Sequence, residues 1–183
     1  MGLFSKPVMD VEDIYKNEVF SSYKRFLHVY VVNDEKAFIK LNSFDAKQNA
    51  SLFDAPIVKE IPKNKNYFEI FLSVYKEYTS KAYKQEKLDK KQVAEPKVMI
   101  DPKNKVLVYV LFVKDIDPVD TTMIPQTNFV FDWVSINEFL QIVCSNKFVN
   151  YGEGYVDFLV DGISELFNIE EYIKKQKYTS NQE

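Results

Sequence analysis

The sequence predicts an α+β domain, with a mainly antiparallel sheet of about five strands and four or five flanking helices. Residues 106–113 form the longest apolar run, mostly β-branched or aromatic, which is typical of a central strand covered on both faces. Asp, Pro and Asn at 101–104 favour a tight turn, so 97–101 and 106–113 should pair as a hairpin. Because the predicted strands and helices do not alternate strictly, a doubly wound fold is not expected.

The first third of the chain predicts one helix and one hairpin. An i, i+4 ladder of apolar side chains indicates a helix over 11–24, with Asp10 as its N-cap. Residues 26–32 and 37–41 are predicted strands joined by the polar turn 33–36. The following residues, 42–65, are rich in Asn, Ser and Pro and are expected to be irregular.

A long helix is predicted over 67–92. Asn66 and Glu69 have the spacing of a capping box, which satisfies free N–H groups at a helix start. The apolar stripe runs through Phe71 but fails beyond residue 82, where lysines dominate. The helix end, about 83–95, is therefore expected to protrude into solvent before Pro96.

The C-terminal part predicts a strand over 129–133 and two amphipathic helices over 136–146 and 155–167. Ser135 and Glu138 form a capping box for the first of these helices. A last short helix is expected after residue 168, with a frayed tail from about 176. Without a repeat or a linker-like segment, residues 1–183 are expected to form a single globular domain.

Composition restricts the class of protein. One cysteine, Cys144, excludes an internal disulfide framework and fits a reducing compartment. No apolar stretch approaches the length of a membrane span, and the N-terminus lacks the apolar core of a signal peptide. We therefore expect a cytoplasmic protein with no membrane partner.

Charge is divided unevenly along the chain, although the net charge is only −3. Residues 1–114 carry 20 basic and 15 acidic side chains, whereas 115–172 carry 11 acidic side chains and one lysine. An acidic surface steers basic partners toward it. The first functional hypothesis is thus a non-enzymatic protein-binding module that docks a basic protein, by analogy with immunity proteins and antitoxins.

The residues assigned to this docking surface are acids and tyrosines at expected loops and helix starts. They are Asp115, Asp117, Asp120, Asp132, Tyr151, Glu153, Tyr155, Asp157 and Asp161. Tyrosine adds contact area at a small cost in side-chain entropy.

The alternative hypothesis is a divalent-metal-dependent enzyme. Asp115, Asp117 and Asp120 follow the central strand, and carboxylate oxygens are the ligands that Mg²⁺ and Mn²⁺ prefer. Aspartate is also common where strands end, especially beside proline, so these residues equally fit an ordinary strand terminus.

Other chemical signals are weak, and no cofactor is expected. His28 is the only histidine, which argues against a zinc site of the usual composition and favours a structural role. Glu153 between Gly152 and Gly154 would repel a phosphate, so that loop is interpreted as a turn. Arg25 is the only arginine, so nucleic acid is not an expected partner despite the lysines between 81 and 105.

One segment resembles a known enzyme family. Residues 133–138, Trp-Val-Ser-Ile-Asn-Glu, are similar to a segment near the C-terminus of Nudix hydrolases. The glutamate-rich metal-binding box of that family is absent from this sequence, so we do not assign the chain to the family on this segment.

Overall fold

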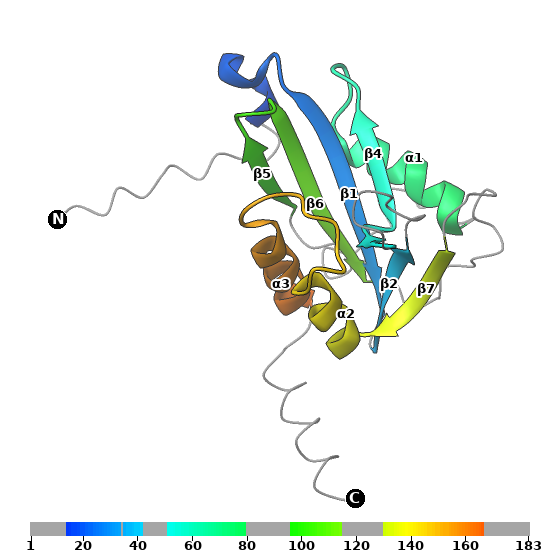
Figure 1. Cartoon of the computed structure of the whole chain (residues 1–183). Helices are drawn as coiled ribbons and strands as arrows, with labels where there is room; N and C mark the ends of the chain where they lie inside the picture. The colour runs from blue at the N-terminus through cyan, green and yellow to red at the C-terminus, as the bar shows by residue number, and fades with distance from the viewer. Residues whose placement is uncertain (1–13, 34, 42–50, 80–95, 115–129, 167–183) are drawn as a thin grey trace, which may run out of the picture.

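The computed structural model describes residues 14–33, 35–41, 51–79, 96–114 and 130–166. A seven-stranded mixed sheet lies at its centre (Figure 1). The strands are β1 (Lys24–Val32), β2 (Lys36–Leu41), β3 (Phe53–Asp54), β4 (Ile57–Ile61), β5 (Lys97–Asp101), β6 (Val106–Lys114) and β7 (Val130–Ser135).

The strand order is β3-β2-β1-β6-β5, with β4 paired to β1 and β7 paired to β2. One edge of β1 is shared, because β4 pairs with Arg25 to Val29 and β2 pairs at Val32. The other edge of β1 pairs in parallel with β6, from Lys24 opposite Val106 to Val32 opposite Lys114. All the other pairs are antiparallel, so the two central strands are the parallel ones.

Each face of the sheet carries a hydrophobic core. Leu27, Val29 and Val31 of β1 pack with Phe71 of α1 (Tyr67–Thr79) on one face. Alternate residues point the other way, so Tyr30 and Val32 pack with α2 (Ile136–Val143) and α3 (Tyr155–Leu166). β6 is buried along seven of its nine residues, which confirms the prediction of a central strand covered on both faces (Figure 1).

The α+β class and the mainly antiparallel pairing are confirmed, but the predicted numbers of strands and helices are wrong. The described residues form seven strands instead of the expected five or so, because residues 53–54 and 57–61, predicted to be irregular, form β3 and β4. In β4 only the two end residues, Ile57 and Ile61, are buried, so it lacks the alternating pattern that reveals a strand. The described residues contain three α-helices rather than four or five.

The predicted first helix is also wrong. Ile14–Lys16 and Glu18–Phe20 are two short 3₁₀ turns, and β1 begins at Lys24. Asn17 is extended (φ −71°, ψ 126°), and its side-chain oxygen accepts a hydrogen bond from the backbone N–H of Val19 at 3.1 Å. This local bond ends one turn and starts the next, so the apolar ladder does not continue as a helix.

The capping predictions at Asn66 and Ser135 are confirmed, whereas the predicted cap Asp10 lies outside the described residues. Glu69 N–H donates to Asn66 Oδ1 at 2.8 Å, and Asn66 N–H donates to Glu69 Oε2 at 3.0 Å. Glu138 N–H donates to Ser135 Oγ at 3.1 Å at the start of α2. The expected protruding helix end at 83–95, the last short helix and the tail from 176 lie outside the described residues.

The hairpin between β5 and β6 is confirmed. Asp101 Oδ1 accepts from the backbone N–H of Asn104 at 3.1 Å, and Lys105 takes the left-handed conformation (φ 53°) that closes the turn.

No helix in the described part of the chain has the length and apolar character needed to cross a membrane.

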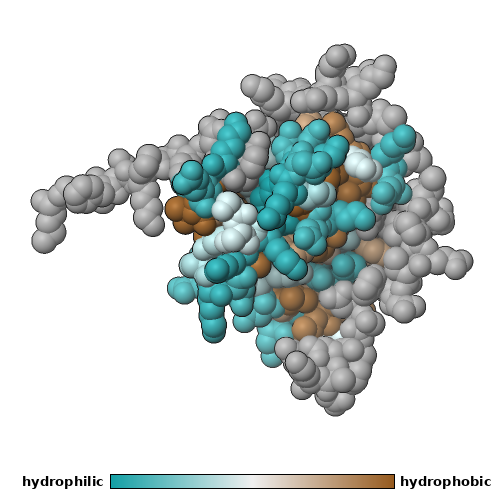
Figure 2. Space-filling view, turned by 90° about the horizontal axis from the view of Figure 1, so that it is seen from above, coloured by the Kyte–Doolittle hydropathy of each residue, from teal (hydrophilic) through white to brown (hydrophobic). Residues whose placement is uncertain are grey.

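Exposed apolar surface is scattered over the described residues. The large hydrophobic side chains that are exposed, Val19, Val58 and Ile100, lie on three different elements. In the view from above, hydrophobic side chains accordingly form small patches separated by hydrophilic ones (Figure 2).

Candidate functional site

A buried polar cluster lies between β1 and the start of α3. Tyr155, the first residue of α3, places its hydroxyl 2.6 Å from His28 Nδ1 and 2.8 Å from the hydroxyl of Tyr30. His28 and Tyr30 are two apart on β1, so both side chains point to the face that α3 covers. All three residues are at most 2% exposed, so substrate cannot reach the imidazole directly.

A second polar group continues the cluster toward the edge of the sheet. Lys40 of β2 lies opposite Asp54 of β3, and the Nζ to Oδ2 distance is 3.7 Å. The hydroxyl of Tyr151 donates to the other oxygen of Asp54. Lys40 and Asp54 are 8% and 7% exposed, so two charges that burial would penalise separately are buried as a pair.

Burial sets the protonation of the cluster. Removal from water lowers the pKa of His28 from 6.5 to about 4, and the Asp54 carboxylate offsets this only in part. The same cause raises the pKa of Tyr151 and Tyr155 well above the usual value for tyrosine. Burial lowers the pKa of Lys40, and Asp54 opposes the effect. At neutral pH the imidazole and the phenols are thus uncharged.

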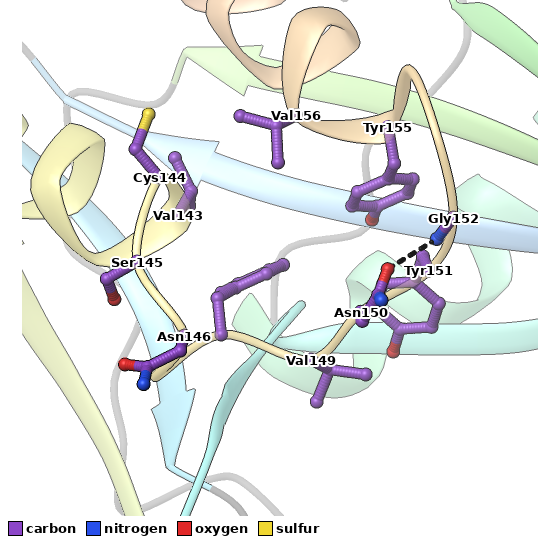
Figure 3. A pocket seen from close by; sticks show the side chains of 11 residues that line it. Val143, Cys144, Ser145, Asn146, Val149, Asn150, Tyr151, Gly152, Tyr155 and Val156 are labelled. Carbon is purple, nitrogen blue, oxygen red and sulfur yellow. Dashed lines mark hydrogen bonds between the residues drawn. The ribbon is translucent and has the colours of Figure 1, made fainter.

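A cavity of about 600 Å³ opens beside this cluster (Figure 3). It lies between the end of α2 and the start of α3, and the connecting segment 144–154 forms much of its wall. Tyr151 and Tyr155 line it with their rings 4.8 Å apart, and Phe148 packs near Tyr155. The hydrogen bonds to His28, Tyr30 and Asp54 therefore hold two of the aromatic walls in place.

Backbone hydrogen bonds anchor the connecting segment to the sheet. Phe53 N–H donates to the carbonyl of Lys147 at 2.8 Å, and Val149 N–H donates to the carbonyl of Phe53 at 2.9 Å. Gly152 N–H donates to Asn150 Oδ1 at 3.0 Å, and Gly152 itself has a φ of 113°, where only glycine is unstrained. The cavity wall is thus pre-formed.

The structure separates the residues predicted to form a docking surface. Asp132, Glu153, Asp157 and Asp161 are exposed. Tyr155 is 1% exposed, so it is a core residue and cannot contact a protein partner. Tyr151 is half-buried, with its hydroxyl on Asp54, and Asp115, Asp117 and Asp120 lie outside the described residues.

The described residues do not fit a divalent metal. No group of three or more His, Cys, Asp or Glu side chains lies close enough to share an ion within the described ranges. On α1, Glu69 is hydrogen-bonded to the backbone N–H of Asn66. The predicted alternative site at Asp115, Asp117 and Asp120 therefore stays a prediction.

Sequence reasoning missed His28, Lys40 and Asp54 as members of one cluster. His28 was predicted to be a structural histidine in a strand, which agrees with its burial and hydrogen bond. A polar residue inside an apolar strand, as in Leu27-His28-Val29, signals a buried polar contact, but its partner Tyr155 is 127 positions away. Only the fold brings the two together.

Comparisons with known proteins identify structural neighbours alone. No family model and no curated protein matches the chain. The fold is similar to a bifunctional NMN adenylyltransferase/ADP ribose pyrophosphatase from Francisella tularensis, with a TM-score of 0.57 and 10% identity over 79% of this chain. A second structure of that enzyme, complexed with AMP and a manganese ion, gives the same values. The chain spans only 42% of the length of these two proteins.

A Nudix hydrolase from Nitrosomonas europaea is also similar, with a TM-score of 0.48 and 12% identity over 78% of this chain and 87% of that protein. The prediction of a non-enzymatic, immunity-like protein-binding module is wrong, because the fold is similar to that of an enzyme, the bifunctional NMN adenylyltransferase/ADP ribose pyrophosphatase. The alternative, an enzyme, agrees better with this similarity. At such identities the similarity concerns the fold.

Proposed function

We propose that this chain is a hydrolytic enzyme that cleaves a phosphoanhydride bond in a nucleotide such as ADP-ribose. The observation that carries the proposal is the fold, which over 79% of the chain is similar to part of a bifunctional NMN adenylyltransferase/ADP ribose pyrophosphatase. The same enzyme has been solved with AMP bound, and AMP is the nucleotide half of ADP-ribose. The second support is the pre-formed cavity, whose volume lies in the range of small-molecule sites.

The identity of the carboxylates that would hold a divalent metal is part of the proposal. Hydrolysis of phosphoanhydrides commonly uses a divalent metal to stabilise charge on the phosphate oxygens. The described residues supply no such set, so the candidates are Asp115, Asp117 and Asp120, which directly follow β6 in the sequence. Strand ends beside parallel pairs often carry the ligand-binding residues of a sheet, and β6 pairs in parallel with β1.

A turnover assay with a panel of nucleotides tests this function. ADP-ribose, NADH and nucleoside triphosphates are incubated with the full chain and Mg²⁺ or Mn²⁺, and products are separated by chromatography. We expect turnover of at least one compound, lowered about 100-fold or more in Asp115→Asn and Asp117→Asn. Asp161→Asn, an exposed acid on α3, is the control and should match the native chain. Equal activity in all variants would exclude those aspartates.

A thermal melt tests the metal independently of turnover. At a metal concentration 100 times Kd, specific binding stabilises the folded state by about 2.7 kcal/mol, which raises Tm by several degrees. We expect this shift with Mg²⁺ or Mn²⁺ and its loss in Asp115→Asn. A shift that persists in Asp115→Asn and Asp117→Asn would place the metal elsewhere.

A further inference from the structure

The cavity beside Tyr151 and Tyr155 has walls without charge. It is lined by apolar and aromatic side chains, among them Val143, Phe148 and Val156, together with small polar ones and two asparagines, Asn146 and Asn150. A phosphate group would find no lysine or arginine among these lining residues. The part of a ligand that fits here is uncharged.

The start of α3 also disfavours a phosphate in the cavity. The N-terminus of α3 adjoins the cavity at Gly152 and Tyr155, and helix N-termini attract anions. Here Glu153 precedes the helix and Asp157 lies in its first turn, and both are exposed acids. Their charge repels a phosphate from the backbone N–H groups at the start of α3.

What the walls do offer is ring surface and an amide. Tyr151 is half-buried and fixed by its hydrogen bond to Asp54, so it presents its ring without a further loss of side-chain entropy, and the buried ring of Tyr155 packs behind it with centroids 4.8 Å apart. Asn150 and Tyr151 lie on the segment that leads to Gly152, and Tyr155 and Val156 lie on the start of α3 (Figure 3). Stacking on an aromatic ring stabilises a bound base whatever its sequence identity.

Asn150 supplies polar recognition. Its Oδ1 accepts from Gly152 N–H, which orients the amide, and its NH₂ group makes no hydrogen bond within the described residues. An N–H donor on a fixed amide can bind a ring-nitrogen acceptor on the edge of a nucleobase, such as N1 or N7 of adenine.

We propose that this cavity binds the nucleobase of a nucleotide, with the phosphates lying outside it. The inference rests on the proposed function for the identity of the rest of the ligand, and it names the end of the substrate that this site recognises. Adenine is the base to test first, because the structural neighbour binds AMP.

Calorimetry with three probes tests the site: adenosine, AMP and ribose 5-phosphate, each added to the full chain. We expect adenosine and AMP to bind with Kd values within about threefold of each other, because the phosphate makes no contact that contributes. Ribose 5-phosphate should not bind at the same concentrations. Tighter binding of ribose 5-phosphate than of adenosine, or no binding of adenosine at millimolar concentration, would overturn the proposal.

Two substitutions locate the binding in the cavity. Asn150→Asp keeps the oxygen that holds Gly152 N–H but removes the NH₂ donors, so adenosine should bind about tenfold more weakly. Adenosine carries no charge, so repulsion by the new carboxylate does not enter. Val156→Phe fills the cavity and should abolish binding, and a thermal melt checks that this variant folds.

The matched control is Asn33→Asp. Asn33 Oδ1 accepts backbone N–H groups of Glu35 and Lys36 in a similar turn, at a position that does not line the cavity. This variant should bind adenosine as the native chain does. Equal weakening by Asn33→Asp and Asn150→Asp, or no weakening by Asn150→Asp, would contradict a base site here.

The two proposals fail separately. A chain that binds adenosine through Asn150 but hydrolyses no nucleotide keeps the base site and loses the enzymatic function. A chain that hydrolyses ADP-ribose with the same KM in the native protein and in Asn150→Asp keeps the enzymatic function and loses the base site.

Discussion

His28 is the one histidine of the chain, and the fold keeps it neutral. It lies in β1 at 2% exposure, with the hydroxyl of Tyr155 2.6 Å from Nδ1 and the ring of Tyr151 packed edge-on at 4.6 Å between centroids. Protonation would bury a charge among phenol rings, and the neighbouring Lys40 disfavours it further. The histidine thus links α3 to the sheet and does not act as an exposed base.

A pH titration by NMR measures this directly. Because His28 is the only histidine, its imidazole signal needs no assignment, and we expect a pKa of about 4. The folded pKa lies below the unfolded value of 6.5. Protonation of His28 therefore leaves the free energy of unfolding unchanged well above pH 6.5 and lowers it as pH falls toward 4. From pH 7 to pH 5 the free energy of unfolding should fall by about 2 kcal/mol more than in His28→Gln. A titration midpoint near 6.5 would mean that the imidazole is solvated.

Gly162 marks the closest approach of α3 to the sheet. A Cβ at this position would overlap the ring of Phe112 and lie 2.5 Å from its Cε2 atom. Phe112 stacks on Tyr30 with centroids 5.0 Å apart, so its ring has little room to move.

We therefore expect Gly162→Ala to lower the free energy of unfolding by about 1–3 kcal/mol, although alanine favours helices. Urea denaturation measures the change. Ser164→Ala on the exposed side of the same helix is the control and should stay within about 0.5 kcal/mol. A stability equal to or higher than that of the native chain in Gly162→Ala would show that α3 is not held this close to β6.

At the scale of elements, helices cover both faces of the sheet. Phe71 of α1 and Phe139 of α2 are both 0% exposed and belong to the two different cores. Each Phe→Ala change should cost about 3–5 kcal/mol, because a buried ring is lost and a cavity is left. Urea denaturation of both variants compares the two faces. A loss below about 1 kcal/mol for either variant would mean that its helix is not packed on the sheet.

Local sequence patterns predicted most of the elements that have a one-sided or fully apolar pattern. The capping boxes at Asn66 and Ser135 and the run 106–113 each depend on residues close in sequence, and all three predictions are confirmed. β4 was missed because its middle residues are exposed, and the 11–24 helix failed because Asn17 breaks it. The parallel pairing of β1 with β6 joins residues about 80 positions apart, which no local pattern encodes.

The candidate site was less predictable than the fold. The charge distribution favoured an acidic docking surface, but Tyr155 is buried and holds the imidazole of His28. The cavity depends on backbone bonds from Phe53 to Lys147 and Val149, nearly 100 positions along the chain.

At the scale of the whole molecule, the cavity and the candidate metal-binding carboxylates belong to different parts of the sequence. The mixed sheet with helices on both faces is similar to part of a bifunctional NMN adenylyltransferase/ADP ribose pyrophosphatase. The described residues provide an uncharged cavity but no set of carboxylates for a metal. We therefore propose that the cavity binds the base and that Asp115, Asp117 and Asp120 supply the carboxylates.

A single-turnover experiment tests the hydrolytic function most directly. The full chain, in excess over ADP-ribose and with millimolar Mg²⁺ or Mn²⁺, is sampled over hours, and the nucleotides are separated by chromatography. Excess protein makes even a slow reaction visible, since every substrate molecule meets an enzyme. The account predicts complete conversion to AMP and ribose 5-phosphate in equal amounts, and slower conversion in Asn150→Asp. ADP-ribose that stays intact with both metals, while calorimetry shows it bound, would contradict the account.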